Sequence, residues 1–451
     1  MKYLFSAAAL LAATVVAEKR DLCSDGTVDD GGNWYCQKVD AITYTGVGGT
    51  GSYNKITGMF TENSGYCTSA AQGYSGSMSP LDEEVSMHIR GPIQLKQFAV
   101  YTPSSASKKR SAHARRHAHG HVHQHHARDA AVGDLVVATI NGVVESWTNE
   151  YSGEASTSAP ASSATEAPAT YSAAVSVIQN NVVASSSSAA AASSTLDSSS
   201  DSTTSSSGGW SRTAYYDSES GTKDGLVFLN HNGGSGSGSF DYTFGNSLSY
   251  ASADGCSGVS EPTTLEDTTL PSSEEIVIMS DTKCDGDDCG FVRNDTVAYH
   301  GFDGSSKAFF FEFQMPDSGE TSTSEYDPVN MPAVWMLNAQ IPRTLQYGNA
   351  DCSCWESGCG EFDIFEVLAA GDTRMKSTLH GNIAGGDSDY FARPTGSPQK
   401  AVMLLNNNNI HIKLLDSSTD FGSTMDMDFI NDLCSSTLTQ SLTTSLFALV
   451  D

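Results

Sequence analysis

Short β-like runs recur through the second half of the chain, separated by turns rich in Gly, Asp and Ser. They contain the apolar, β-branched and aromatic residues that fill strands. The runs cover Leu226–Leu229, Glu275–Met279, Lys307–Met315, Pro332–Leu337, Glu361–Glu366, Arg374–His380 and Ile410–Leu414. Many short strands without intervening helices predict an all-β protein, with an antiparallel β-sandwich or jelly roll over residues 209–451.

Two segments of this region give narrower predictions. Phe309, Phe311 and Phe313 alternate along one run, so they should form an apolar stripe on one face of a strand. Near the end of the chain, apolar residues fall at helical spacing between Met425 and Leu433, which predicts one short helix.

The first part of the chain, residues 21–151, is rich in Gly and Tyr and predicts a smaller β domain. Strand-like runs lie at Ala41–Thr45 and Gln97–Tyr101. Further along, Asn141-Gly142 separates two apolar runs, and this dipeptide favours a two-residue hairpin turn. The runs are Leu135–Ile140 and Val143–Trp147. We interpret residues 104–130 as a loop inserted in this domain, which resumes at the hairpin.

The inserted loop is basic and contains a cluster of histidines. These are His113, His117, His119, His121, His123, His125 and His126. One interpretation is capture of a transition metal. The other, which we favour, is a disordered loop whose positive charge rises in acid, because no packed scaffold nearby would fix a coordination geometry.

Residues 152–208 consist mainly of Ser, Thr and Ala. Such a segment buries too little apolar surface to offset the entropy lost on ordering, so it predicts a disordered linker, O-glycosylated in a secreted protein.

The N-terminus predicts secretion. Lys2 precedes an apolar, Ala-rich segment, and small residues end at Ala17, which gives a signal peptide over residues 1–17. This apolar segment is too short to span a bilayer as a helix, and no later run is long enough either. The formal net charge of −29 argues against nucleic acid or an anionic membrane as a partner, because both require a basic surface. We expect a secreted monomer of the extracellular space or cell wall.

Ten cysteines in an oxidising compartment predict disulfides. Three lie early and seven late, so either one bridge joins the two parts or each part keeps an unpaired thiol. The early cysteines are Cys23, Cys36 and Cys67, and the late ones are Cys256, Cys284, Cys289, Cys352, Cys354, Cys359 and Cys434.

Two cysteine groups admit a second interpretation. Cys352, Cys354 and Cys359 could form a metal or redox site. We favour the alternative that they form disulfides, which hold a loop in place. Around Cys284 and Cys289, aspartates offer oxygen ligands for calcium, but their spacing matches no calcium loop and a disulfide closes the segment more simply. We therefore predict no metal and no cofactor.

The stretch Glu361–Glu366 places three acids within six residues, alternating at first with apolar residues. Strict alternation puts Glu361 and Glu366 on opposite faces of a strand, whereas one extra residue in a β-bulge at Ile364-Phe365 brings them to the same face, with Asp363 between them. Retaining glycosidases need two carboxyl groups about 5–5.5 Å apart, one as nucleophile and one as acid/base. The acids are thus a candidate catalytic group.

This stretch resembles the ExDxxE signature of family 16 glycoside hydrolases, in the bulged form of laminarinase-like members. The resemblance implies a concanavalin-like sandwich, with Glu361 as nucleophile, Glu366 as acid/base and Asp363 as the assisting acid. Few residues follow Glu366 compared with that family, so more strands must precede the motif. More closely, residues 335–348 and 352–368 resemble the Tos1/PGA52 family of fungal cell-wall proteins, which implies an extracellular enzyme acting on β-1,3-glucan.

Six further residues are predicted to bind substrate: Trp335, Trp355, Gln340, Arg343, Tyr347 and His380. The aromatic rings have flat apolar faces that match the C–H faces of sugar rings. The remaining residues would supply polar groups to the same cleft, although a lone histidine such as His380 is more often structural.

The sequence therefore predicts a secreted cell-wall glycosidase that cleaves β-1,3-glucan by double displacement, of the endo-β-1,3-glucosidase type. Transglycosylation uses the same intermediate and stays open. The alternative is a wall mannoprotein or glucan-binding protein without catalysis. The two differ in whether Glu361 and Glu366 face one cleft.

Overall fold

The computed structural model of the chain describes residues 28–30, 33–62, 65–104, 135–140, 143–148, 209–321, 328–439 and 441–449. The predicted signal peptide, nearly all of the His/Arg-rich loop and the Ser/Thr/Ala-rich linker lie outside the described residues.

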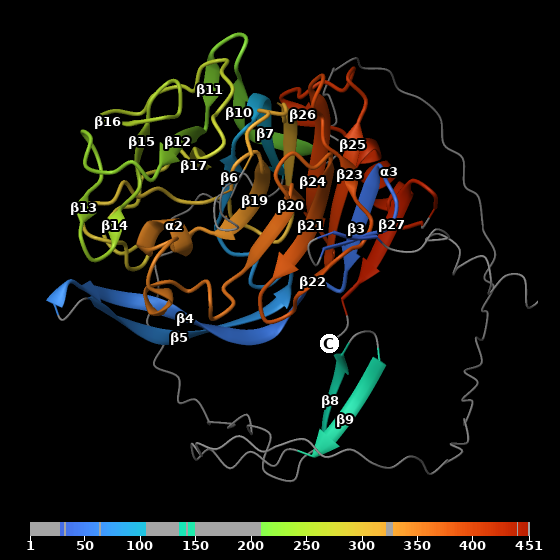
Figure 1. Cartoon of the computed structure of the whole chain (residues 1–451), viewed down its shortest axis with the longest axis horizontal. Coiled ribbons are helices and arrows are strands. Elements are labelled where there is room, and N and C mark those ends of the chain that lie inside the picture. The colour runs from blue at the N-terminus through green and yellow to red at the C-terminus, as the bar shows by residue number, and fades with distance from the viewer. Residues whose placement is uncertain are drawn as a thin grey trace, which may run out of the picture. The chain divides into compact units, whose positions relative to one another are not determined.

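Within the described part of the chain, one large sheet has nine strands (Figure 1). Its path is β11 (Thr222–Asp224), β10 (Trp210–Asp217), β7 (Gln94–Pro103), β18 (Lys307–Gln314), β24 (Gln399–Asn406), β25 (Asn409–Leu415), β3 (Ala41–Thr45) and β27 (Thr444–Ala448), and β26 (Thr424–Met425) pairs with β10. β27 runs parallel to β3, whereas the other pairs of this sheet are antiparallel.

The second large sheet has ten strands among the described residues, all in antiparallel pairs. Its path is β16 (Gly258–Val259), β15 (Ser249–Ala251), β12 (Leu226–Asn230), β17 (Glu275–Ser280), β6 (Val85–Arg90), β19 (Ala333–Asn338), β20 (Glu361–Glu366), β21 (Arg374–His380) and β22 (Gly385–Gly386), and β23 (Phe391–Ala392) pairs with β21. Apart from the two runs around Asn141-Gly142, every run expected from the sequence overlaps a strand of one of these sheets, so the prediction of a mostly β protein is confirmed.

The main core joins the two large sheets. Phe309, Phe311 and Phe313 of the nine-stranded sheet are fully buried, as their alternation predicts, and cluster with Met87 and Phe362 of the ten-stranded sheet. Burying apolar side chains of this size contributes about 1.5–3 kcal/mol each. One face of each large sheet is thus buried in the core.

The predicted division into a first domain over 21–151 and a second over 209–451 is not what the structure has. β3 and β7 lie in the nine-stranded sheet, and β6 lies between β17 and β19 in the ten-stranded sheet. The described residues before Ser104 and after Gly209, with these two included, belong to one compact unit. The sequence pattern identifies strands but not their partners, and here strands far apart in the chain pair with each other.

Residues 111–203 are assigned to a second unit. In it, β8 (Leu135–Ile140) and β9 (Val143–Thr148) pair in antiparallel register, which confirms the predicted hairpin around Asn141-Gly142. That the first β domain resumes at this hairpin stays a prediction.

Three smaller two-stranded sheets belong to the first unit. They are β1 (Val28–Asp30) with β2 (Asn33–Tyr35), β4 (Gly48–Phe60) with β5 (Tyr66–Ser77), and β13 (Phe240–Asp241) with β14 (Gly245–Asn246). The β4–β5 hairpin is long, and β4 contacts the segment before β20: the Asn54 backbone N–H donates to Ser357 Oγ at 2.9 Å. Cys67 of β5 forms a disulfide with Cys352, so of the two arrangements that the sequence left open, the structure has the bridge between early and late cysteines.

The described helices are α2 (Gln340–Thr344), α3 (Met427–Ser436) and the 3-10 helix η3 (Ala350–Cys352). α3 is the short helix predicted near the end of the chain, and its Ile430 and Leu433 are buried. None of the described helices has the length and apolar character required to cross a membrane.

Candidate active site

The acidic strand β20 contains the bulge that its sequence predicts. The β19 partners of Glu361, Asp363 and Glu366 are Leu337, Trp335 and Ala333, in that order. Those partners alternate along β19 and therefore share a face, so the three acids share that face as well. Ile364 is the extra residue, because the register resumes with Phe365 opposite Val334.

The face with the acids carries further polar residues on the neighbouring strands, which lie next to one another in Figure 1. By register, its members include Glu275 of β17, Ser86, His88 and Arg90 of β6, Trp335 of β19, and Lys376, Thr378 and His380 of β21. The opposite face of β20, with Phe362 and Phe365, belongs to the core. The acids thus lie on the side of the sheet that faces away from the core.

Trp355 contacts the first acid directly. Its indole Nε1 donates a hydrogen bond of 2.7 Å to Glu361 Oε2. Disulfides fix the loop that carries it: Cys354 bonds to Cys359 on either side of Trp355, and Cys352 bonds to Cys67. The predicted structural role of these three cysteines is confirmed, and their loop places an aromatic ring beside a candidate catalytic carboxyl group.

His380 contacts the middle acid. Its Nε2 lies 2.8 Å from Asp363 Oδ2, and this hydrogen bond raises the pKa of His380 to about 9. Burial raises the pKa of Asp363 to about 7, and the negative charge of Glu366 acts in the same direction. The histidine therefore brings positive charge into a site that is otherwise rich in carboxyl groups.

The two outer acids differ in their neighbours. Burial raises the pKa of Glu361, the charge of Glu366 adds to this, and the Trp355 hydrogen bond opposes it. Glu366 instead has a cation beside it, with Arg90 Nη2 at 3.4 Å from Glu366 Oε1. Separate environments for two nearby carboxyl groups are what acid–base chemistry requires. These environments alone do not show which carboxyl group is the nucleophile and which the acid. That assignment comes from the order of the acids in the ExDxxE motif.

The predicted aromatic residues occupy different positions. Trp335 is only 4% exposed and stacks on His88 with a centroid distance of 5.2 Å, so little of its ring is open to a ligand. Tyr347 is 53% exposed, and its ring centroid lies 6.0 Å from that of Trp355. A hollow of about 430 Å3 beside them is lined by Gln346, Asn349 and Trp355, among others.

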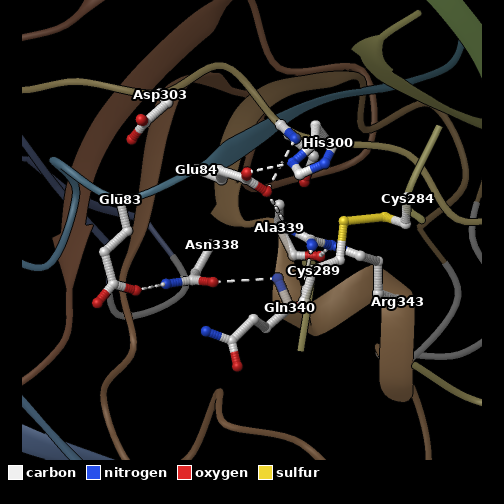
Figure 2. A network of polar contacts seen from close by, with 12 residues as sticks. Glu83, Glu84, Cys284, Cys289, His300, Asp303, Asn338, Ala339, Gln340 and Arg343 are labelled. Carbon is white, nitrogen blue, oxygen red and sulfur yellow. Dashed lines mark hydrogen bonds and ion pairs between the residues drawn. A yellow bond between two sulfur atoms is a disulfide. The ribbon is translucent and has the colours of Figure 1, made fainter. Parts of the chain in front are cut away.

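Gln340 and Arg343 are not brought to the acids, in contrast to the prediction. Arg343 is buried and its Nη2 donates to Glu84 Oε2 at 2.5 Å, while Gln340 Nε2 donates to Tyr53 OH at 2.7 Å. Figure 2 shows Arg343 gathered with Glu84 and His300, and Gln340 pointing away from them. Helix α2 follows β19 and turns Arg343 towards Glu84 and Gln340 towards Tyr53.

Sequence reasoning missed two residues of the polar face. Arg90 contacts Glu366, and His88 packs on Trp335, yet both come from β6, which no prediction included. A signal was present, because polar and apolar residues alternate from Ser86 to Arg90 as they do at the start of the acidic stretch.

Two groups of described side chains have the spacing of metal ligands, one with Glu84, Cys289 and His300, the other with Cys284, Asp288 and Cys289. Cys284 and Cys289 form a disulfide, as predicted, so their sulfurs are not free thiolates. Both groups are also part of ion pairs, in which His300 bonds to Glu84 and Asp288.

The titration of Asp363 and His380 predicts a pH dependence of stability. Both pKa values lie above those of an unfolded chain, so the folded state binds more protons between about pH 4 and 9. Their contribution to the free energy of unfolding is therefore favourable in acid and is lost as pH rises through about 7 and 9. Asp363→Asn combined with His380→Asn should flatten the stability curve between pH 5 and 8.5.

Urea unfolding at these two pH values gives the change in the free energy of unfolding between them. The exposed Asp287→Asn variant is a control and should show the same change as the wild type. An equal change in the wild type and the double variant would show that this pair does not titrate as described.

The fold and the site define a β-sheet protein whose polar sheet face carries three clustered carboxyl groups beside the half-buried Trp355 ring. Comparisons with known proteins extend this description. The model of the C-terminal part of cell wall protein YJL171C/Tos1 matches residues 208–433, and the model of its N-terminal part matches residues 40–103. No solved structure matches the chain.

Several curated proteins are similar over nearly their whole length. A protein of Candida albicans named "Probable circularly permuted 1,3-beta-glucanase TOS1" is 42% identical, over 95% of this chain and 97% of that protein. A "Probable circularly permuted 1,3-beta-glucanase" of Arthroderma benhamiae is 41% identical, over 96% and 97%. The TOS1 protein of Saccharomyces cerevisiae is 44% identical, over 89% and 91%. The chain belongs to the Tos1/YJL171C family of fungal cell wall proteins.

Proposed function

We propose that this protein is a cell-wall 1,3-β-glucanase of the endo type that acts by retaining double displacement. The observation that carries the proposal is the bulge at Ile364, which puts Glu361, Asp363 and Glu366 on one polar sheet face. The names of its relatives support the same activity and the same substrate, a β-1,3-glucan.

In the proposed mechanism, the Glu361 carboxylate attacks the anomeric carbon while Glu366 protonates the oxygen of the leaving sugar. The C1–O bond breaks, and a covalent glycosyl ester forms on Glu361. Glu366 then removes a proton from the incoming acceptor, which displaces Glu361. A water acceptor gives hydrolysis, whereas a sugar hydroxyl gives transglycosylation.

The spacing of the two acids is compatible with these roles. Their partners on β19 are four residues apart, which separates their Cα atoms by about 13 Å. Two glutamate side chains that lean inward close most of this gap. Asp363 lies between them, and its contact with His380 holds a positive charge close to both glutamates.

The strand order supports the relation to circularly permuted enzymes. We propose that the paired sheets are the jelly-roll sandwich of family 16 glycoside hydrolases. β3, β6 and β7 precede the catalytic strand in the chain, and each pairs on both sides with strands of the two large sheets. Early strands of this kind supply the β-structure that the short segment after Glu366 lacks.

Digestion of laminarin by the protein and by its Glu361→Gln variant tests the proposal. Reducing ends should appear with the wild type and not with the variant. A parallel assay on a β-1,4-glucan should give no product. Binding of laminarin without cleavage by either protein would instead favour a glucan-binding wall protein.

A further inference from the structure

Glu275 is the centre of a second polar group on the same sheet face as the acids. Its Oε1 accepts hydrogen bonds from His88 Nδ1 and Gln346 Nε2, both at 2.8 Å, and its Oε2 accepts one from Tyr347 OH at 2.7 Å. Burial acts to raise the pKa of Glu275, but the bond and charge of His88 dominate and lower it to about 2. Glu275 is therefore ionised, and its hydrogen bonds fix the positions of Gln346 and Tyr347.

A hollow of about 210 Å3 lies beside this group. Its lining includes His231, Gln346 and Tyr347, with Phe244 and Pro342 as apolar walls. Among the described residues, both ring nitrogens of His231 and the amide oxygen of Gln346 are buried without a hydrogen-bond partner. Buried polar atoms are rarely left unpaired, so two orphaned groups on one hollow indicate a site for a polar ligand.

The chemistry of the orphaned atoms defines the ligand. The Glu275 carboxylate can only accept, so Gln346 must turn its NH2 group towards it, which leaves the amide oxygen as an acceptor. Burial lowers the pKa of His231, so its imidazole is neutral and offers one donor and one acceptor. Adjacent hydroxyl groups of a sugar satisfy this set, because each hydroxyl both donates and accepts.

Other ligand classes fit less well. The negative charges of Glu275 and of the three acids disfavour an anion. A metal ion would need further ligands, but the Glu275 oxygens are already engaged, and no group of potential metal ligands among the described side chains includes His231. The apolar walls formed by Phe244 and Pro342 suit the C–H face of a sugar ring.

Aromatic rings connect this hollow to the acids. The Tyr347 ring centroid lies 6.0 Å from that of His231 and 6.0 Å from that of Trp355, and Trp355 donates to Glu361. A glucan chain that is cleaved at the acids and passes over these rings would place a different sugar unit, one further along the glucan, in the hollow.

We infer that His231 and Gln346 form a subsite for a glucosyl unit of the β-1,3-glucan chain, remote from the scissile bond. This inference rests on the proposed function. The subsite makes affinity depend on chain length, because short oligosaccharides bound at the acids do not extend to it.

Calorimetric titration of the Glu361→Gln protein with laminaribiose and laminarihexaose tests the subsite. His231→Phe in that background keeps a ring beside Tyr347 but removes both nitrogens. We expect it to weaken laminarihexaose binding about tenfold to a hundredfold and to leave laminaribiose binding unchanged. The fully exposed Tyr242→Phe serves as control and should change neither.

Equal laminarihexaose affinity with and without His231→Phe would overturn the subsite while leaving the proposed function intact. Failure of both oligosaccharides to bind the Glu361→Gln protein would instead overturn the proposed function and the subsite with it. A second measurement uses intact His231: its ring 15N resonances should shift on addition of laminarihexaose. Unchanged resonances would mean that only water satisfies these atoms.

Discussion

Glu361→Gln is expected to reduce hydrolysis of linear β-1,3-glucan by about 10⁴-fold or more, because the amide cannot form the covalent glycosyl ester. The substitution is nearly isosteric, and the Trp355 N–H, which donates to Glu361 at 2.7 Å, can donate to the amide oxygen instead. The loss of activity should therefore not come from a loss of structure.

Stability measurements separate these two effects. Burial raises the pKa of Glu361, so keeping this carboxylate ionised in the folded protein costs free energy. The neutral glutamine removes this cost, and the variant should unfold at a temperature equal to or above that of the wild type. Glu219→Gln, at an exposed position, serves as the matched control and should keep full activity. An active Glu361→Gln protein would exclude this residue as the nucleophile.

Glu366→Gln should produce a different kinetic pattern. Activity on laminarin should fall about 10²- to 10⁴-fold, because the leaving sugar no longer receives a proton. A substrate with a dinitrophenyl leaving group needs no proton, so its first step should remain fast. Azide, which needs no general base, should restore turnover and give a β-glycosyl azide.

The same experiment assigns the two roles. With Glu361→Gln, azide should attack directly in place of the nucleophile and give an α-glycosyl azide. Exchange of the two azide products between the variants would mean that Glu366 is the nucleophile and Glu361 the acid. This result matters because neither the contact of Glu366 with Arg90 nor that of Glu361 with Trp355 assigns the two roles by itself.

The strands and the bulge were predictable from local pattern. Alternation of apolar and polar residues has period two, so the odd spacing of Glu361 and Glu366 could be reconciled with one face only by an extra residue, which proved to be Ile364. Trp355 and His380 were also predictable as neighbours of the acids, since both lie close to β20 in the sequence and contact Glu361 and Asp363.

Long-range pairing was not predictable in this way. β6 is more than 200 residues from β19 in the chain, and its local sequence pattern does not predict that the two strands pair. His88 and Arg90 were therefore missed, and the early strands were assigned to a separate domain. Gln340 and Arg343 were misplaced for a related reason: a short helix after β19 directs them to Tyr53 and Glu84, two partners from the early part of the chain.

The central claim is that three acids on one face of β20 perform a retaining double displacement. Proton NMR during the first minutes of hydrolysis of a reduced β-1,3-gluco-oligosaccharide tests it most directly, because the newly formed reducing end is seen before it mutarotates. The claim predicts that the β-anomer appears first and the α-anomer only later. Initial release of the α-anomer, or no cleavage at all, would contradict it.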